Sequence, residues 1–404
     1  MKRTSLPAVL LLAAVLVSGA PTTAGAAFRG DDGRIAFVST RDSGLEIYSM
    51  ASDGSDVQRL SNNPFPDQQP MFSPDGRRIL FLRTVAGSTD IWVMRADGSK
   101  QKQLTEHPAF DGHPSWSPDG TQVAFESDRR GNVDIFVMDA NGSNVKALTT
   151  KKIEEECPVW SPDGKRIIFE SFRNSNLDIY DMAADGTDTR RLTTDPGEDG
   201  YPSYRPSDGK IAFETDRDGD FELYTMDPDG SNQVPLAPSA GTQDYEPTYA
   251  PDGVQLAYTS AAAGNDYEIW RMQSDGTGST QLTSATGISF QNDWGPVCTV
   301  MGTSGDDVLG GTAGDDVICG LGGDDVLTGD TGDDSIFGGS GDDVVSGEGG
   351  ADILAGNAGA DRVLGGTEDD RVSGVDGRGD DVVKGGDGVD DCPADSGDRV
   401  RDCP

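Results

Sequence analysis

Gly311-Thr312-Ala313-Gly314-Asp315-Asp316-Val317-Ile318 is one unit of a pattern that repeats every nine residues from Gly302 onward. In seven consecutive steps an aspartate returns to the same place: Asp307, Asp316, Asp325, Asp334, Asp343, Asp352, Asp361 and Asp370. Two residues after each aspartate comes an aliphatic residue: Leu309, Ile318, Leu327, Ile336, Val345, Leu354, Val363 and Val372. A nine-residue period suits one strand and turn of a parallel β-roll. The repeat therefore predicts a roll with the aliphatic side chains stacked as a narrow core.

The glycines and aspartates of this repeat have the chemistry of a calcium site. Glycine adopts positive φ and lets the backbone turn tightly, so that carbonyl oxygens converge. Calcium prefers about six to eight oxygen ligands, which turn carbonyls and the carboxylates of neighbouring turns supply, whereas magnesium fits less well. We therefore expect several calcium ions, with the eight repeat aspartates as metal ligands.

The units resemble the hemolysin-type (RTX) calcium-binding repeat, Gly-Gly-x-Gly-x-Asp-x-aliphatic-x. The resemblance covers Gly302 to about Cys392 and implies a parallel β-roll in which successive turns share calcium between carbonyls and the repeat aspartate. The second glycine is present only at Gly338-Gly339, Gly365-Gly366 and Gly385-Gly386. Glu368 replaces the fourth-position glycine, and two extra residues precede Asp381, so the turns after Glu368 depart from the pattern.

Composition alone offers an alternative, a Gly/Asp-rich tail that stays solvated and disordered. The segment from Cys298 to Pro404 holds 26 acidic and 6 basic residues. However, random Asp-rich sequence does not hold a nine-residue register with an aliphatic residue at a fixed offset. Charge repulsion should keep the metal-free segment open. We therefore expect calcium binding and folding to be one event.

The whole chain is acidic, with a formal net charge of −38 over 404 residues. Nucleic acid is therefore excluded as a partner, because phosphate binding needs a basic face. Residues 1–26 predict a cleavable signal peptide, with Lys2 and Arg3 before an apolar run and Ala24-Gly25-Ala26 at its end. No integral membrane segment is expected after cleavage. The predicted location is secreted, extracellular or associated with the cell surface.

The five cysteines lie mostly at the ends of the nine-residue array. Cys298 and Cys319 bracket its first units, and Cys392 and Cys403 bracket its end. In an oxidising compartment two disulfides would fasten the ends of the array, where a solenoid has no neighbour to pack against. The alternative is that all five are reduced, buried thiols. Cys157 is left over, and its role stays open.

A second period, near 44 residues, runs through 27–297. Its turn Asp53-Gly54-Ser55 recurs in five further units, at Asp97, Asn141, Asp185, Asp229 and Asp275. A Ser-Pro-Asp-Gly turn at Ser73 recurs at Ser117 and Ser161 and, altered, at Pro206 and Pro251. Such turns are strong hairpin signals, and four short strands per unit indicate a propeller blade. The first unit lacks its opening strand, which Asp293-Trp294-Gly295-Pro296 at the other end would supply.

These units resemble the TolB-like (PD40) propeller repeat. Trp116-Ser117-Pro118-Asp119-Gly120, Val123-Ala124-Phe125, Asp134-Ile135-Phe136-Val137-Met138 and Leu148-Thr149 carry the resemblance. It implies an all-β chain: a six-bladed β-propeller at 27–297, followed by the calcium-binding β-roll at 298–404. Propellers support many unrelated activities, so the resemblance says much about fold and little about function.

One acid per blade stands three residues before the proline of each predicted inner strand: Asp67, Asp111, Glu155, Asp199, Asp244 and Asp293. Together these six acids would form a ring at one mouth of the channel and bind a cation or a cationic ligand. Alternatively, each acid orders its own loop through backbone hydrogen bonds. The second interpretation is favoured, because a feature equal in every blade usually serves the blade.

Sequence motifs of the common enzyme classes are absent, including a Gly-x-Ser-x-Gly elbow, a His-Glu-x-x-His motif and a phosphate loop. His107 and His113 are the only histidines, and both are expected in one exposed loop between blades. Carboxylate chemistry of the glycosidase or lyase kind stays open, because 70 acidic residues give many pairs.

We therefore expect a secreted calcium-binding protein that is not an enzyme, with a propeller that binds an unknown protein or a cell-surface polymer. Contact candidates are the loops Phe65–Gln69 and Phe110–His113, which differ between blades. One alternative is an extracellular hydrolase or lyase with a carboxylate or calcium site at the channel mouth, using Asp67, Asp111 and Asp244. Another is a surface-attachment element with the propeller as a spacer. The sequence leaves the number of calcium ions and the oligomeric state open.

Overall fold

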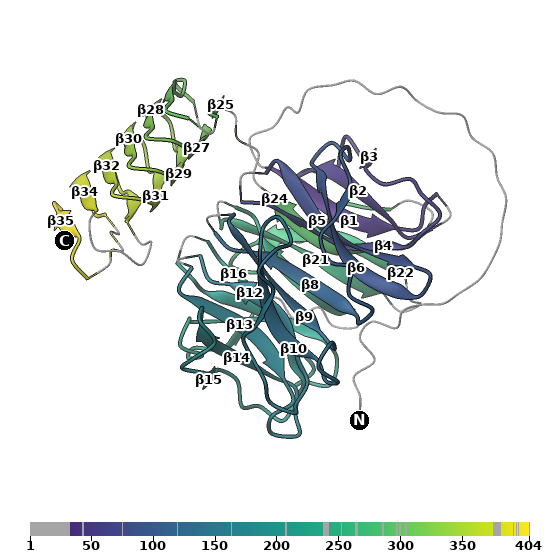
Figure 1. The fold of residues 1–404 in the computed structure, drawn as a ribbon. Helices are drawn as coiled ribbons and strands as arrows, with labels where there is room; N and C mark the ends of the chain where they lie inside the picture. Colours follow the sequence, from purple (N-terminus) through teal and green to yellow (C-terminus); the bar gives the residue numbers. More distant parts are fainter. Residues whose placement is uncertain are drawn as a thin grey trace.

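The computed structural model describes residues 33–403 apart from 43, 75, 119, 163, 207, 237–241, 252, 263–265, 285–286, 296–297, 299, 304, 315, 375–380, 391, 393 and 395. The predicted signal peptide lies outside the described residues. Within them every regular element is a β-strand, as the all-β prediction requires. The strands form a ring of sheets between Arg34 and Gly295, and a ladder of short parallel strands between Val300 and Arg401 (Figure 1).

The ring consists of six four-stranded antiparallel sheets, which confirms the six-bladed propeller. The first blade contains β24 (Ser289–Gly295), β1 (Arg34–Ser39), β2 (Glu46–Ala51) and β3 (Gln58–Arg59). The second and third contain β4 (Asp67–Phe72), β5 (Arg78–Val85), β6 (Ser88–Arg95) and β7 (Lys102–Gln103), then β8 (Asp111–Trp116), β9 (Gln122–Ser127), β10 (Asp134–Asp139) and β11 (Lys146–Ala147). The fourth contains β12 (Glu155–Trp160), β13 (Arg166–Ser171), β14 (Asp178–Ala183) and β15 (Arg190–Arg191). The fifth and sixth contain β16 (Asp199–Tyr204), β17 (Ile211–Thr215), β18 (Glu222–Met226) and β19 (Val234–Pro235), then β20 (Gln243–Tyr249), β21 (Gln255–Ala262), β22 (Asp266–Gln273) and β23 (Thr280–Gln281).

The first blade joins both ends of the propeller. Strand β24 pairs antiparallel with β1, with Ile35 opposite Trp294 and Ser39 opposite Ser289. The missing opening strand of the first unit is thus supplied from the other end, as predicted. This pairing closes the ring and removes two sheet edges that would otherwise expose unpaired backbone groups.

The 44-residue period appears in the core as one aromatic residue per blade. Phe37, Phe81, Phe125, Phe169 and Phe213 are fully buried in the second strands of the first five blades, and Tyr258 takes the corresponding place in the sixth. Hydrophobic clusters join neighbouring blades, as where Leu80 and Ile91 pack with Trp116 and Phe125. Each blade therefore buries its apolar faces against its neighbours, and the inner strands β4, β8, β12, β16, β20 and β24 are held around the channel.

The roll consists of two parallel sheets that receive alternate repeats. One contains β25 (Val300–Met301), β27 (Val317–Gly322), β29 (Ser335–Ser340), β31 (Ile353–Ala358) and β33 (Arg371–Ser373). The other contains β26 (Val308–Gly310), β28 (Val326–Thr331), β30 (Val344–Gly349), β32 (Arg362–Thr367), β34 (Val382–Asp387) and β35 (Arg399–Arg401). Residues 18 apart are partners, as in Ile318 opposite Ile336, so two nine-residue units make one turn.

The predicted aliphatic residues form the core of the roll. Ile318, Leu327, Ile336, Val345, Leu354, Val363 and Val372 are buried in one cluster, with Leu309 packed against it and Val383 extending it. Disulfides join Cys298 to Cys319 and Cys392 to Cys403, as predicted for the two ends of the array. Cys157 forms neither bridge and lies buried in the propeller.

Candidate functional site

The repeat aspartates form a hydrogen-bonded row along the roll. One carboxylate oxygen, Oδ1, of Asp343 accepts the backbone N–H of Asp325 at 2.8 Å, and Oδ1 of Asp361 accepts that of Asp343 at the same distance. Asp352 and Asp370 make the same contacts with the N–H groups of Asp334 and Asp352, at 2.8 and 2.9 Å. The eight predicted residues therefore lie in two parallel files, one on each side of the roll.

The second oxygen of these carboxylates, Oδ2, faces a space that only glycine leaves open. In Asp325, Asp343, Asp352 and Asp370 this atom is buried and accepts no hydrogen bond from the residues that the structure describes. A side chain at Gly338 would collide with Oδ2 of Asp343 and with the carbonyl oxygen of Gly356. A carboxylate oxygen and a backbone carbonyl thus converge beside each such glycine. Buried oxygens of this kind are costly unless a hydrogen bond or a cation satisfies them.

Electrostatics at the row also favour a bound cation. Burial, and then the charges of neighbouring aspartates, raise the pKa of Asp343 and of Asp370 to about 6. The same two causes raise the pKa of Asp352 to about 7. A hard cation held between carboxylate and carbonyl oxygens would offset both the cost of burial and the repulsion between neighbouring aspartates. Calcium prefers this set of oxygen donors. The residues present therefore fit calcium.

The row extends beyond the predicted eight aspartates. Asp381 accepts the N–H of Asp361 at 2.7 Å, and Asp390 accepts that of Asp370 at 3.0 Å, each across 20 residues instead of 18. The two inserted residues before Asp381 therefore leave the hydrogen-bonded row unbroken. A further, exposed set of contacts went unpredicted. Among the described residues, the first aspartate of several Asp-Asp pairs accepts a backbone N–H from one turn further on, as Asp324 does from Asp342 at 2.9 Å; the others are Asp306, Asp333, Asp342 and Asp369.

In the propeller, the predicted acids are held by arginines of their own blades. Asp67 pairs with Arg83 at 2.7 Å, Asp111 with Arg129 at 2.7 Å, Asp199 with Arg217 at 2.8 Å, and Glu155 with Arg173. Asp244 instead accepts the hydroxyl of Ser260 at 2.6 Å. All five are buried at the first or second residue of an inner strand. These contacts favour a structural role within each blade over a ligand-binding ring. The partners named above are side chains, whereas backbone groups had been expected.

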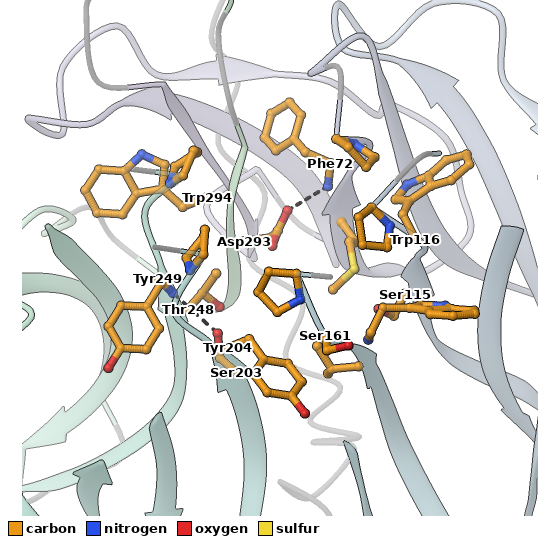
Figure 2. Close-up of a pocket in the computed structure, with 18 of the residues that line it drawn as sticks. Phe72, Ser115, Trp116, Ser161, Ser203, Tyr204, Thr248, Tyr249, Asp293 and Trp294 are labelled. Atoms are coloured by element: carbon orange, nitrogen blue, oxygen red, sulfur yellow. Dashed lines mark hydrogen bonds between the residues drawn. The ribbon is translucent and has the colours of Figure 1, made fainter. Parts of the chain in front are cut away.

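Asp293, the sixth predicted acid, does not occupy the corresponding position. Ser289 stands opposite Ser39 where the other inner strands have their acid, and Asp293 lies four residues further along β24. There it accepts the N–H of Phe72 at 2.6 Å, and burial raises its pKa to about 7 (Figure 2). The spacing to Pro296 is not equivalent to that in the other blades, because Asn292 stands where the other inner strands have their proline.

One residue of each inner strand, the third in β4, β8, β12, β16 and β24 and the fourth in β20, lines the channel and differs among most blades; we call it the third-position residue. These residues are Gln69, His113, Cys157, Tyr201, Glu246 and Gln291, and all have positive φ, between 40° and 52°. A register shift follows each of these residues in β4, β8, β12, β16 and β20. The side chain at this position is therefore of five kinds in the six blades, with glutamine twice, while the surrounding sequence repeats.

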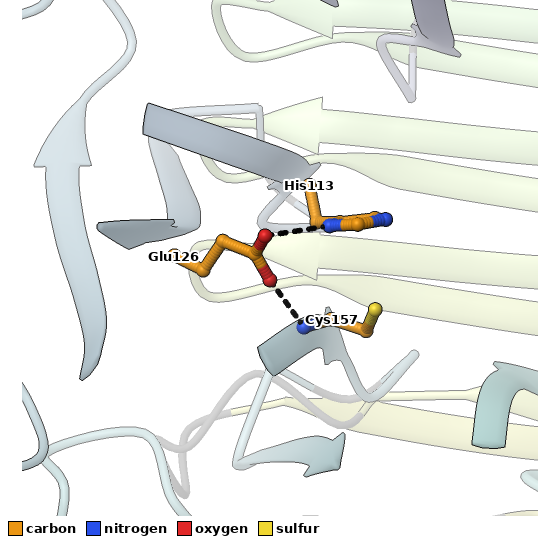
Figure 3. Close-up of side chains that lie close together, drawn as sticks. All are labelled: His113, Glu126 and Cys157. Atoms are coloured by element: carbon orange, nitrogen blue, oxygen red, sulfur yellow. Dashed lines mark hydrogen bonds and ion pairs between the residues drawn. The ribbon is translucent and has the colours of Figure 1, made fainter. Parts of the chain in front are cut away.

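The expectation that His113 lies in an exposed loop is wrong. His113 lies in β8, where Nδ1 is 2.8 Å from Oε1 of Glu126, while Oε2 of Glu126 accepts the N–H of Cys157 at 2.9 Å (Figure 3). Burial lowers the pKa of His113, but the carboxylates of Glu126, Glu170 and Glu156 together outweigh burial and raise that pKa to about 9. Burial and nearby carboxylates raise the pKa of Glu156 to about 8. His107 is exposed, as predicted.

A cavity of about 850 Å³ lies where the inner strands end. Its lining includes the last aromatic residue of each inner strand, of which Phe72, Trp116, Tyr204, Tyr249 and Trp294 are labelled in Figure 2. His113, Cys157 and Tyr201 also line it. The channel is therefore apolar at this end, with titratable groups deeper along the same strands.

Known families match both parts of the chain. The TolB beta propeller domain (PD40) matches residues 61–156 and 148–301, and the RTX calcium-binding nonapeptide repeat (4 copies) matches 299–327, 320–354, 346–378 and 355–391. A search of curated proteins found no match.

Solved structures are similar to the propeller. TolB from Acinetobacter baumannii is 26% identical, with a TM-score of 0.60, over 66% of this chain and 68% of that chain. A putative TolB from Agrobacterium tumefaciens is 21% identical, with a TM-score of 0.53, over 66% of this chain and 100% of that chain. Hydrazine synthase from Kuenenia stuttgartiensis is 16% identical, with a TM-score of 0.56, over 65% of this chain and 46% of that chain. The last two likenesses concern the fold alone.

Proposed function

Because this chain belongs to the TolB propeller family and carries RTX calcium-binding repeats, we propose that it is a secreted, noncatalytic calcium-binding protein. Its propeller presents a binding face for a protein or a cell-surface polymer, and its roll folds with calcium. The two disulfides support an oxidising location. Over the part of the chain that the structure describes, no helix is long and apolar enough to cross a membrane.

The observation that carries the calcium proposal is the unsatisfied Oδ2 atom. Asp343 and Asp352 are each 1% exposed, and neither forms an ion pair with another described residue. Leaving such charges without a cation would destabilise the roll by several kcal/mol per ion. A divalent cation in each gap removes the penalty, so calcium acts as part of the core.

A calcium titration of the full chain, followed by calorimetry and circular dichroism, tests this proposal. Asp343→Asn keeps the shape of the side chain but removes one ligand charge, so we expect calcium affinity to fall on the order of tenfold or more at the adjoining sites. The matched control is Asp330→Asn, 13 residues earlier in the roll, where the aspartate is exposed. Equal calcium affinity in the two variants would show that the row of repeat aspartates is not the calcium-binding site.

Two exposed phenylalanines support the binding face. Phe65 and Phe110 are 38% and 37% exposed, and they precede the inner strands of neighbouring blades. Most of both predicted contact loops, 67–69 and 111–113, lies in β4 and β8, where Asp67 and Asp111 are buried. Exposed aromatic residues on adjacent loops are typical anchors for a partner.

Pull-downs against surface proteins and glycan arrays, with calcium present, test the binding face. Any partner retained by the wild-type chain should be lost from the Phe65→Ala/Phe110→Ala variant. The control is Val234→Ala, which removes an apolar side chain that is 50% exposed from the outer strand β19. A partner retained equally by both variants would place the binding face elsewhere. Retention of no partner by the wild type would leave the propeller without its proposed role.

A further inference from the structure

The channel brings together three side chains of different ligand chemistry. His113, Glu126 and Cys157 each offer one ligand atom, and these atoms all lie within 4.8 Å of one another. They come from β8, β9 and β12, so the group connects the third blade with the fourth (Figure 3). An imidazole nitrogen, a carboxylate oxygen and a thiolate sulfur are the usual donors for Zn²⁺, which binds four ligands; in open sites three of them come from protein and water supplies the fourth.

The hydrogen bonds around the group hold its members in place. Glu126 is fixed by the N–H of Cys157, and the backbone N–H of His113 donates to the amide oxygen of Gln69 at 3.0 Å. The ring of Tyr201 packs edge-on against His113 at 5.8 Å between centroids. Side chains held this way lose little freedom when they bind a ligand, which favours a preorganised site.

The local charges also favour a cation. Glu156 and Glu170 lie close enough for their charges to act on His113. Among the described ion pairs, no lysine or arginine pairs with Glu126, whereas buried acids at the start of the same strands pair with arginines. A divalent cation would offset this excess of negative charge.

The group of His113, Glu126 and Cys157 occurs at one blade junction, whereas one of its contacts recurs between other blades. Glu126, Glu170 and Glu214 occupy one position in three successive blades, and each accepts the N–H of the third-position residue of the next blade. That contact belongs to the architecture. Only between the third and fourth blades does the shared glutamate meet a histidine and a cysteine, because the third-position residues of the other blades are glutamine, tyrosine and glutamate.

From this geometry we propose that His113, Glu126 and Cys157 form a site for a thiophilic divalent cation of the Zn²⁺ type, separate from the calcium sites of the roll. Sulfur and nitrogen donors select such ions against calcium, which prefers oxygen alone. On binding, the thiol proton of Cys157 and the proton shared by His113 and Glu126 would leave, and a water molecule would complete the coordination. The site would fasten two neighbouring blades at the channel wall.

Cobalt and zinc binding to the full, calcium-saturated chain tests this proposal. Co²⁺ should bind at one ion per chain, give a thiolate-to-metal charge-transfer band in the near ultraviolet, and be displaced by Zn²⁺ but not by added calcium. Cys157→Ser should abolish the band, and His113→Gln should weaken Zn²⁺ binding by more than the about 10- to 100-fold that loss of an outer-shell partner costs. His107→Gln is the matched control, since it removes the exposed histidine, and should bind as the wild type does.

The wild-type spectrum decides the matter even if a variant fails to fold. A wild-type chain without the charge-transfer band would overturn the proposal, as would a band of full strength in folded Cys157→Ser. Folding of each variant is checked by its circular dichroism and melting temperature in calcium. Zn²⁺ should also raise the melting temperature of the wild-type propeller and leave that of folded His113→Gln unchanged.

Discussion

The propeller and the roll both bury a regular series of acidic side chains, but the groups that compensate the negative charge differ between the two regions. Asp111 in the propeller has the guanidinium of Arg129 at 2.7 Å, whereas Asp352 in the roll has only a backbone N–H for one oxygen and no described partner for the other. The roll segment has 6 basic residues for 26 acidic ones. Periodic acids therefore indicate a cation site only where the fold supplies no counter-charge of its own.

Removal of calcium should have the largest effect and should separate the two regions. We expect chelation to unfold the roll and to leave the propeller folded, because the roll depends on calcium for folding whereas the propeller has an apolar core of its own. Hydrogen exchange of the full chain, read by segment, measures this: protection should disappear from 300–401 and persist in 34–295. Magnesium should not restore it. Equal protection of the roll with and without chelator would contradict coupled folding.

Loss of an internal counter-charge should be the next largest effect. Arg129→Ala leaves Asp111 buried without its partner, which costs about 3–5 kcal/mol of propeller stability. Urea unfolding of the calcium-loaded chain measures the loss, and calcium affinity should be unchanged. Arg130→Ala is the control: Arg130 is 45% exposed and lies 3.6 Å from Asp134, so its loss should cost about 0–1 kcal/mol. Similar losses for both variants would argue against the buried pair.

The terminal disulfides test how the roll is held at its ends. Cys298→Ser/Cys319→Ser opens a loop with a sequence separation of 21, so the calcium-loaded roll should lose about 3 kcal/mol. Cys392→Ser/Cys403→Ser opens the shorter loop, with a separation of 11, and should cost slightly less. The calcium midpoint for folding should rise in both variants. Unchanged midpoints would show that calcium alone holds the ends.

Asp293 provides the smallest test, through pH. Its pKa is raised to about 7 by burial, so its protonated form is favoured in the folded propeller. The protonated carboxyl group of Asp293 thus contributes to the stability of the propeller. This contribution is complete below about pH 4 and is lost as pH rises through 7. Asp293→Asn, which still accepts the N–H of Phe72, should therefore stabilise the propeller at pH 8 by about 1–3 kcal/mol and have no effect near pH 4. Melting temperatures of the variant and the wild type at the two pH values measure the difference.

The periods of the sequence predicted both architectures, because each repeat must bury its apolar residues against the next. Asp381 and Asp390 were missed as parts of the row, since a shifted spacing looks like a broken repeat although the hydrogen bonds bridge it. Asp293 was assigned to the wrong position because proline, and not Trp294, guided the alignment. His113 and Cys157 are 44 residues apart, one blade period, and that spacing was the signal that would have placed them side by side.

The pairing of β24 with β1 has a consequence for how the chain acquires its structure during synthesis. Ser39 and Ser289, which meet in the first blade, are 250 residues apart. Contacts of such sequence separation form slowly, because a long loop must close first. One edge of β1 therefore remains unpaired until β24 has been synthesised. Before closure the free edge of β1 can pair with another chain, so misassociation is expected in this interval.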